Sequence, residues 1–146
     1  MSNIGQTIII RTDLFSLPDD VGLLSAQVAH IHMECVRKMI INNMVREENF
    51  IPIKLTKEHG VDVLSFMDWV RDPYLFVKQV PNKESLKHFS KLVHEAGLPL
   101  DEWYDTVYIR LSKTMKQAFP NVLVGISIGP CDADKIRTVV GDLPLL

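Results

Sequence analysis

The sequence predicts an α/β domain, built as a three-layer α/β/α sandwich around a four-stranded mixed sheet. Two apolar runs, at residues 7–10 and 122–128, show no alternation of apolar and polar residues, which is typical of strands covered on both faces. Strand-like segments also occur at residues 74–80 and 101–109, and segments with helical periodicity lie between strands. We therefore expect helices on both faces of one sheet.

The first strand is predicted at residues 6–12 and the first helix at residues 20–42, after a Pro-Asp-Asp sequence that favours a helix start. Apolar residues at helical spacing predict the buried stripe of this helix. The stripe comprises Val21, Leu24, Val28, Ile31 and Cys35, and three small residues, Ser25, Ala26 and Ala29, are expected to let the helix lie close to the sheet.

The next elements are a surface connection at residues 43–60 and a short helix at residues 61–70, and the extended connecting stretch of about 42–68 includes the start of this helix. The predicted apolar face of the helix is Val63, Phe66, Met67 and Val70. Asn82 then caps a helix that ends at Gly97. Its predicted core face is Leu86, Phe89, Leu92, Val93 and Ala96, and its outer face carries Lys83, Lys87 and Lys91.

Residues 110–118 are predicted to form a loop or one or two helical turns, between the third strand at 101–109 and the fourth at 122–128. A last short helix is predicted from Pro130 to Gly141. The apolar tail that follows, residues 142–146, is expected to dock on the rest of the protein. The whole chain, residues 1–146, is predicted to be a single domain.

Composition narrows the class of protein. Of the 146 residues, 47% are hydrophobic and 23% are charged, as in ordinary globular domains, and the net charge of −2 gives no general basic excess for binding nucleic acid. No apolar run approaches the ~20 residues of a membrane span. The N-terminal sequence lacks a signal-peptide pattern, and Cys35 and Cys131 form no redox or metal motif. These features predict a cytoplasmic protein with no membrane partner.

Short motifs in a fixed order resemble the type II peptidyl-tRNA hydrolases and their bacterial relatives. The motifs are Arg11-Thr12-Asp13-Leu14, Ala26-Gln27-Val28-Ala29-His30, Phe76-Val77-Lys78-Gln79-Val80, Gly97-Leu98-Pro99, Asp105, Ile128-Gly129-Pro130 and Gly141 with Leu143, Leu145 and Leu146. They span roughly residues 6–36 and 70–146. The resemblance implies a four-stranded mixed sheet, a homodimer, and hydrolysis of the ester that joins a peptide to the 3′ end of tRNA.

Two departures from the family pattern bear on activity. The family's first loop is rich in glycine and lysine, and one lysine is regarded as catalytic; the matching position here, four before Gln27, is Leu23. The loop instead carries Asp19 and Asp20, which would repel a phosphate backbone. The family's Ala-Gly-x-Thr sequence after the aspartate is replaced by residues 106–109, Thr-Val-Tyr-Ile.

The resemblance implies catalytic roles for Asp105, His30 and Gln27, with Asp105 orienting or deprotonating a water molecule. Further residues are expected to bind substrate: Thr12, Asp13, Glu34, Arg110 and Lys113. His30 and His32 point to different sides of a helix, so only His30 and Glu34 could share an ion. Two ligands are fewer than a metal site usually needs, and we expect neither a metal nor another cofactor.

Two functions remain open on the sequence. One is hydrolysis of peptidyl-tRNA or a related aminoacyl ester, which Asp105, Gln27 and His30 favour. The other is a divergent paralogue that binds a small molecule or a peptide in the same cleft, which the missing lysine and the acidic loop favour. If the lysines of the chain gather beside Asp105, RNA binding is favoured; if they scatter, it is not.

Overall fold

The computed structural model describes residues 3–45, 54–55 and 63–146, and the side chains of residues 3–38 and 67–146. Its main sheet has the order β4-β1-β6-β5, with strands β4 (Leu75–Val80), β1 (Ile4–Arg11), β6 (Lys116–Asp132) and β5 (Leu100–Arg110). β1 and β4 are parallel, whereas the β1–β6 and β6–β5 pairs are antiparallel. The predicted mixed four-stranded sheet is confirmed.

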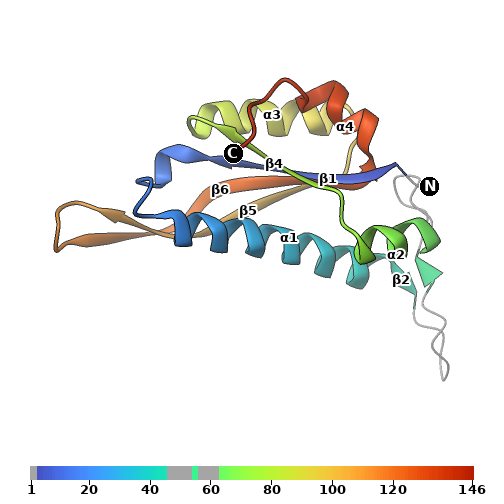
Figure 1. The fold of residues 1–146 in the computed structure, drawn as a ribbon, viewed down its shortest axis with the longest axis horizontal. Coiled ribbons are helices and arrows are strands. Elements are labelled where there is room, and N and C mark those ends of the chain that lie inside the picture. The colour runs from blue at the N-terminus through green and yellow to red at the C-terminus, as the bar shows by residue number, and fades with distance from the viewer. Residues whose placement is uncertain (1–2, 46–53, 56–62) are drawn as a thin grey trace.

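Helices lie on both faces of this sheet. Helices α1 (Val21–Asn43) and α2 (Val63–Arg71) cover one face, and α3 (Lys83–Glu95) and α4 (Ala133–Val140) cover the other (Figure 1). The three-layer arrangement is therefore as predicted. In the described part of the chain, no helix is long and apolar enough to cross a membrane.

The central strand β1 is buried on both sides, which explains its unbroken apolar run. Ile8 and Ile10 belong to the core cluster beneath α1, and Ile9 belongs to the cluster beneath α3 and α4. All three side chains are fully buried. A strand covered on one face only would instead alternate apolar with polar residues.

The predicted contact face of α1 is partly wrong. Leu24, Ile31 and Cys35 are buried, but Val21 is 52% exposed. The three small residues Ser25, Ala26 and Ala29 are exposed and do not face the sheet. Close packing comes from Gly125 on β6 instead, where a Cβ atom would lie 2.9 Å from Ile31 Cδ1 and 2.7 Å from the Ile9 carbonyl oxygen.

Helix α3 is as predicted at its start and on most of its core face. Asn82 caps it, since its Oδ1 accepts the Ser85 N–H at 2.9 Å. Leu86 and Val93 are buried and Phe89 is partly buried, but Ala96 is exposed. In α2, Trp69 is buried while Met67 and Val70 are about half exposed, so the predicted apolar face is wrong for these two. The side chains of Val63 and Phe66 lie outside the described residues.

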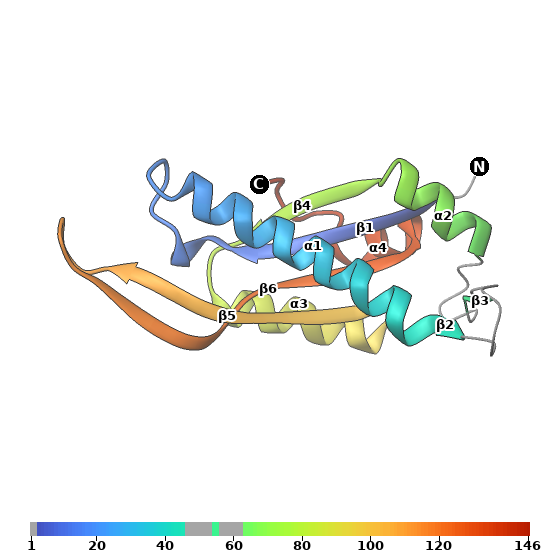
Figure 2. The same cartoon turned by 90° about the horizontal axis from the view of Figure 1, so that it is seen from below.

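The predicted loop at residues 110–118 is confirmed for residues 111–115 only, and no helical turn forms there. β5 and β6 continue as a two-stranded hairpin beyond the end of β1, pairing Tyr108 with Ala118 and Arg110 with Lys116. The Ser112 hydroxyl accepts the N–H groups of Thr114 and Met115 and so closes the tip. We call residues 108–118 the arm; it projects from the body of the protein in both views (Figures 1 and 2).

The last helix begins at Ala133 rather than at the predicted Pro130, because residues 130–132 continue β6. Asp132 caps α4 by accepting the Asp134 N–H, and the C-terminal tail runs along the free edge of β4, where the Leu146 N–H donates to the Val77 carbonyl at 2.9 Å. Much of the predicted connection at 42–68 lies outside the described residues. Two short strands within it, β2 (Met44–Val45) and β3 (Lys54–Leu55), pair with each other, and a 3-10 turn at Thr12–Leu14 follows β1.

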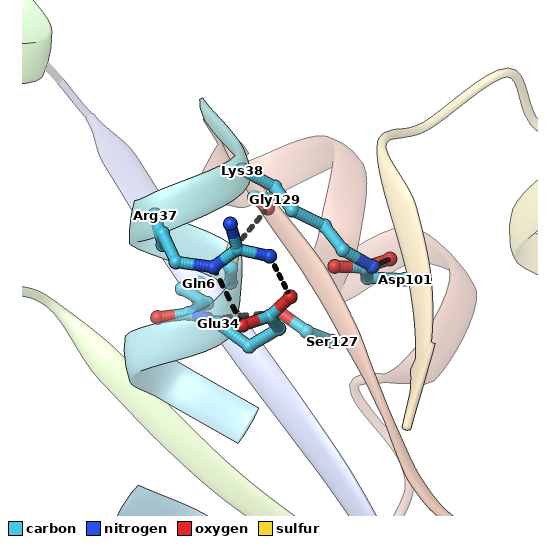
Figure 3. Close-up of polar contacts among 8 residues, drawn as sticks. Gln6, Glu34, Arg37, Lys38, Asp101, Ser127 and Gly129 are labelled. Atoms are coloured by element: carbon cyan, nitrogen blue, oxygen red, sulfur yellow. Dashed lines mark hydrogen bonds and ion pairs between the residues drawn. The ribbon is translucent and has the colours of Figure 1, made fainter. Parts of the chain in front are cut away.

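A buried polar network beneath the middle of α1 holds this helix to the sheet. The Gln6 side chain is fully buried, donates to Ser127 Oγ at 2.8 Å, and lies 2.6 Å from His32 Nδ1 through its oxygen. Because the Gln6 oxygen only accepts, neutral His32 carries its proton on Nδ1. The Cys35 thiol donates to the Gly129 carbonyl beside this network, and burial raises the pKa of Cys35 to about 11 (Figure 3).

Burial lowers the pKa of His32 below its usual 6.5. The unfolded chain therefore binds a proton that the folded chain does not, and the free energy of unfolding is expected to fall as the pH drops below 6.5. The loss is at most about 1.4 kcal/mol per pH unit. Urea unfolding at pH 7.0 and 5.5 measures it. The difference in the free energy of unfolding between the two pH values is expected to shrink in His32→Gln. It is expected to persist in His88→Gln, because His88 is exposed. An equal pH effect in both variants would contradict this assignment.

Candidate active-site groove

A shallow groove of about 480 Å³ lies between α1 and β5, on the sheet face that α1 covers. α1 runs obliquely across this face (Figure 2). The lining of the groove combines a carboxylate on each wall with an indole, an imidazole, a thioether and a guanidinium. The lining residues are His30, Met33, Glu34, Arg37, Trp103 and Asp105. Three of the residues that the sequence predicted for the site, Asp105, His30 and Glu34, are thus brought together.

The alternation of β5 directs Trp103 and Asp105 to the same side. Residues two apart on a strand share a face, and Val107, next in this series, is buried in the cluster beneath α1. The pairing register places one extra residue on β6 opposite Trp103–Tyr104 and another opposite Asp105–Val107, so β6 is bulged on either side of Asp105. Asn121 takes a positive φ of 54° at the second bulge. Bulges bend and twist a strand pair, and the arm leaves the sheet beyond this point.

Gln27 links the two walls of the groove. Trp103 Nε1 donates to Gln27 Oε1 at 2.8 Å, and Gln27 Nε2 donates to Asp105 Oδ2 at 3.0 Å. The indole N–H can only donate, so it fixes which end of the Gln27 amide faces Trp103 and leaves the NH₂ group toward Asp105. Oδ1 of the same carboxylate accepts the Thr106 N–H at 2.7 Å. Each oxygen keeps a lone pair for a further donor, such as water.

Arg37 is a groove residue that the sequence reasoning missed. It follows His30 by seven residues, or about two turns, and this spacing places both on one face of α1. Its guanidinium donates to Glu34 from Nε and from Nη2, with Nε 2.9 Å from Glu34 Oε2 (Figure 3). The hydrogen bond from Arg37 lowers the pKa of Glu34 and raises that of Arg37. The Arg37 side chain is still 56% exposed, so it keeps donors free for a ligand.

His30 and His32 face different neighbours, as their spacing on a helix requires. His30 is exposed and its ring centroid lies 6.1 Å from that of Trp103, whereas His32 contacts the buried Gln6. Among the described residues, no three metal-ligating side chains form a cluster. His30 can therefore contact a molecule in the groove, and His32 belongs to the core.

The remaining predicted substrate-binding residues do not line the groove. Asp13 binds the guanidinium of Arg11 in a two-point ion pair, with the closest atoms 2.7 Å apart, and the Thr12 hydroxyl donates to the Val80 carbonyl. Both therefore brace the end of β1. Arg110 and Lys113 lie on the arm. Thr12, Asp13, Arg110 and Lys113 are therefore not brought beside Asp105, and their role in binding substrate stays a prediction. The sequence alone did not indicate that the hairpin carries Arg110 and Lys113 past the sheet.

The lysines whose side chains the structure describes are scattered. The stripe of Lys83, Lys87 and Lys91 lies on α3, on the opposite face of the sheet from the groove (Figure 1). Lys38, beside the groove, is held by Asp101 at 2.7 Å. Leu23, at the position of the family lysine, is 45% exposed. In the part of the chain that the structure describes, Arg37 is the cation that lines the groove.

Comparison with known proteins agrees with the sequence motifs. The family model described as "Peptidyl-tRNA hydrolase PTH2" matches residues 4–146, which is nearly the whole chain. A search of curated proteins gave no match. The family match extends across both walls of the groove, including Gln27 and Asp105.

Proposed function

Because this chain belongs to the peptidyl-tRNA hydrolase PTH2 family, we propose that it hydrolyses the ester bond of peptidyl-tRNA or of a related aminoacyl ester, with Asp105 as the catalytic base. The observation that supports this most is the hydrogen-bonded chain from Trp103 through Gln27 to Asp105. It holds a carboxylate in fixed orientation at an open groove, with lone pairs left to accept a proton from water.

In the proposed reaction, Asp105 takes a proton from a water molecule while the water oxygen attacks the ester carbonyl carbon. The tetrahedral intermediate then collapses, the bond to the 3′ oxygen of the tRNA breaks, and that oxygen is protonated as it leaves. Gln27 positions Asp105, and His30 contacts the substrate from the facing wall. Arg37 supplies the positive charge that the family's lysine would otherwise provide.

We further propose that the protein acts in the cytoplasm as a homodimer of single-domain chains. The two cysteines, Cys35 and Cys131, are free and buried, which is usual in a reducing compartment. The homodimer rests on the resemblance to the family.

A second function is favoured by one observation at the family's lysine position. Leu23 offers no charge there, and Asp19, four residues before it in the sequence, is exposed, so the helix start repels phosphate rather than binding it. A protein that binds a small molecule or a peptide in the groove, without hydrolysis, would need neither the lysine charge at this position nor a helix start that attracts phosphate. The Asp105 experiment below separates the two functions.

Asp105→Asn keeps the size of the side chain and the acceptor for Gln27 but removes the base. We expect it to lower kcat for hydrolysis of an N-blocked aminoacyl-tRNA by about 100-fold or more. Release of the N-blocked amino acid measures the rate. Asp142→Asn is the control, because Asp142 is exposed and lies outside the groove. If wild type and Asp105→Asn both match the uncatalysed rate, hydrolysis is excluded and the binding function stands.

Arg37→Gln tests the proposed cation. Loss of a charge-assisted contact to the substrate is expected to raise KM or lower kcat by about tenfold. Glu34→Gln should have a smaller effect, because it frees Arg37 while leaving its charge in the groove. The Lys87→Gln variant controls for net charge from the opposite face of the sheet. Equal activity of Arg37→Gln and wild type would contradict this role.

A further inference from the structure

The arm exposes more apolar surface than a two-stranded hairpin tolerates alone. Tyr108, Ile109, Leu111 and Met115 are between 36% and 61% exposed. Beyond the Val107–Phe119 pair, neither β1 nor a helix covers the two strands (Figures 1 and 2). An isolated hairpin is at best marginally stable in water. The tip is nevertheless well defined, because its N–H groups bind Ser112. These features are typical of a segment that packs against another surface.

The charge of the arm is of one sign. Residues 108–118 contain Arg110, Lys113 and Lys116 and no carboxylate. All three side chains are exposed, and within the described residues none of them forms an ion pair. A partner surface for the arm should therefore combine apolar side chains with negative charge.

Such a surface is present on the same chain. We call residues 15–23, which are the loop before α1 together with the first three residues of α1, the acidic loop. It contains Asp19 and Asp20 and no cation. Its apolar residues Leu17, Val21 and Leu23 are between 45% and 53% exposed. Asp19 is exposed, and Asp20 uses one oxygen to accept the Ser16 N–H. The arm and the acidic loop lie at the same end of the molecule in both views (Figures 1 and 2).

We propose that the arm of one copy of this chain packs on the acidic loop of a second copy, and the reverse, in a two-fold symmetric dimer. Both complementary surfaces are on one chain, so a two-fold axis at this end uses each of them twice and leaves neither exposed. The inference rests on the homodimer of the proposed function and adds the surface through which it forms. It also gives the acidic loop a binding partner other than RNA.

The aliphatic residues of the arm favour a protein partner over RNA. RNA is bound by cations together with aromatic side chains that stack on bases. Of the four exposed apolar residues of the arm, Tyr108 alone carries a ring that can stack on a base. Ile109, Leu111 and Met115 offer no such stacking surface, and their burial is favourable against apolar residues such as Leu17 and Val21. Neutralisation of Asp19 and Asp20 by a neighbouring arm would also lower the negative charge that lies about two turns before Gln27, at the start of α1.

Charge reversal tests the interface. In Arg110→Glu/Lys113→Glu the arm becomes negative, and in Asp19→Lys/Asp20→Lys the loop becomes positive. We expect the wild type to sediment as a dimer, and each variant to raise the dimer dissociation constant about tenfold or more through like-charge contacts. Lys83→Glu/Lys87→Glu, on the exposed face of α3, is the matched control and should remain dimeric.

Mixing the two variants distinguishes loss of the interface from loss of the fold. In a heterodimer of the arm variant and the loop variant, both contacts again join opposite charges, so an equimolar mixture should regain the dimer mass. A chain that carries all four substitutions should also dimerise. Analytical ultracentrifugation measures all of these masses.

Three results would overturn the proposal. A monomeric wild type at about 100 μM would exclude both the homodimer and this interface. A dimer that neither reversal weakens would exclude the interface alone, since the chain would then dimerise through another face. Arm reversal that weakens retention of tRNA without changing the mass would assign the arm to RNA instead.

Discussion

The groove depends on one hydrogen-bonded chain, from the Trp103 indole through the Gln27 amide to the Asp105 carboxylate. An indole N–H is a donor only and a carboxylate is an acceptor, so the amide between them has a single favourable orientation. This series of hydrogen bonds joins α1 to β5, which is an edge strand and has β6 as its neighbour. It therefore fixes at once the separation of the two walls and the direction of the carboxylate.

The electrostatics of the groove follow from how its charges are paired. Glu34 holds Arg37, and Asp101 holds Lys38, so cations near the groove already have carboxylate partners. A substrate phosphate must compete with Glu34 for the guanidinium of Arg37. Such competition gives weak binding unless the phosphate makes further contacts. The α3 lysines cannot supply them, because the sheet lies between. Because binding of a phosphate in the groove is expected to be weak, a measurement of activity, rather than of affinity for RNA, decides between hydrolysis and ligand binding.

The predictions from sequence were right where local pattern determines structure. The unbroken apolar run of β1 and the Asn82 cap of α3 both followed from residue type. The family motifs named Gln27 and Asp105 as site residues, and the hydrogen bond between the two is a finding of the structure. The face of α1 was misjudged because small residues were assumed to pack inward, whereas the close approach is made by Gly125 on β6. That contact joins segments far apart in the sequence, so the helical pattern could not show it.

The arm was missed for a related reason. Residues 110–118 have no apolar alternation and no core to contact. Only the pairing of β5 with β6 makes residue 110 and residues 116–118 part of strands, on either side of the tip at 111–115. Arg37 was missed because the groove that it lines is completed by Trp103 and Asp105 on another element, β5. A search for residues seven positions from His30 on the same helix would have found it.

The most direct test of the account is the NMR signal of the Trp103 indole N–H in Asp105→Ala. The protein has two tryptophans, so the indole signal that remains in Trp69→Phe and is also present in the wild type belongs to Trp103. If the three side chains form one chain, removing the carboxylate frees the Gln27 amide and shifts both its side-chain N–H signals and the Trp103 indole signal. An unchanged indole signal, with Gln27 likewise unchanged, would show that Asp105 is not held by this chain and would contradict the account.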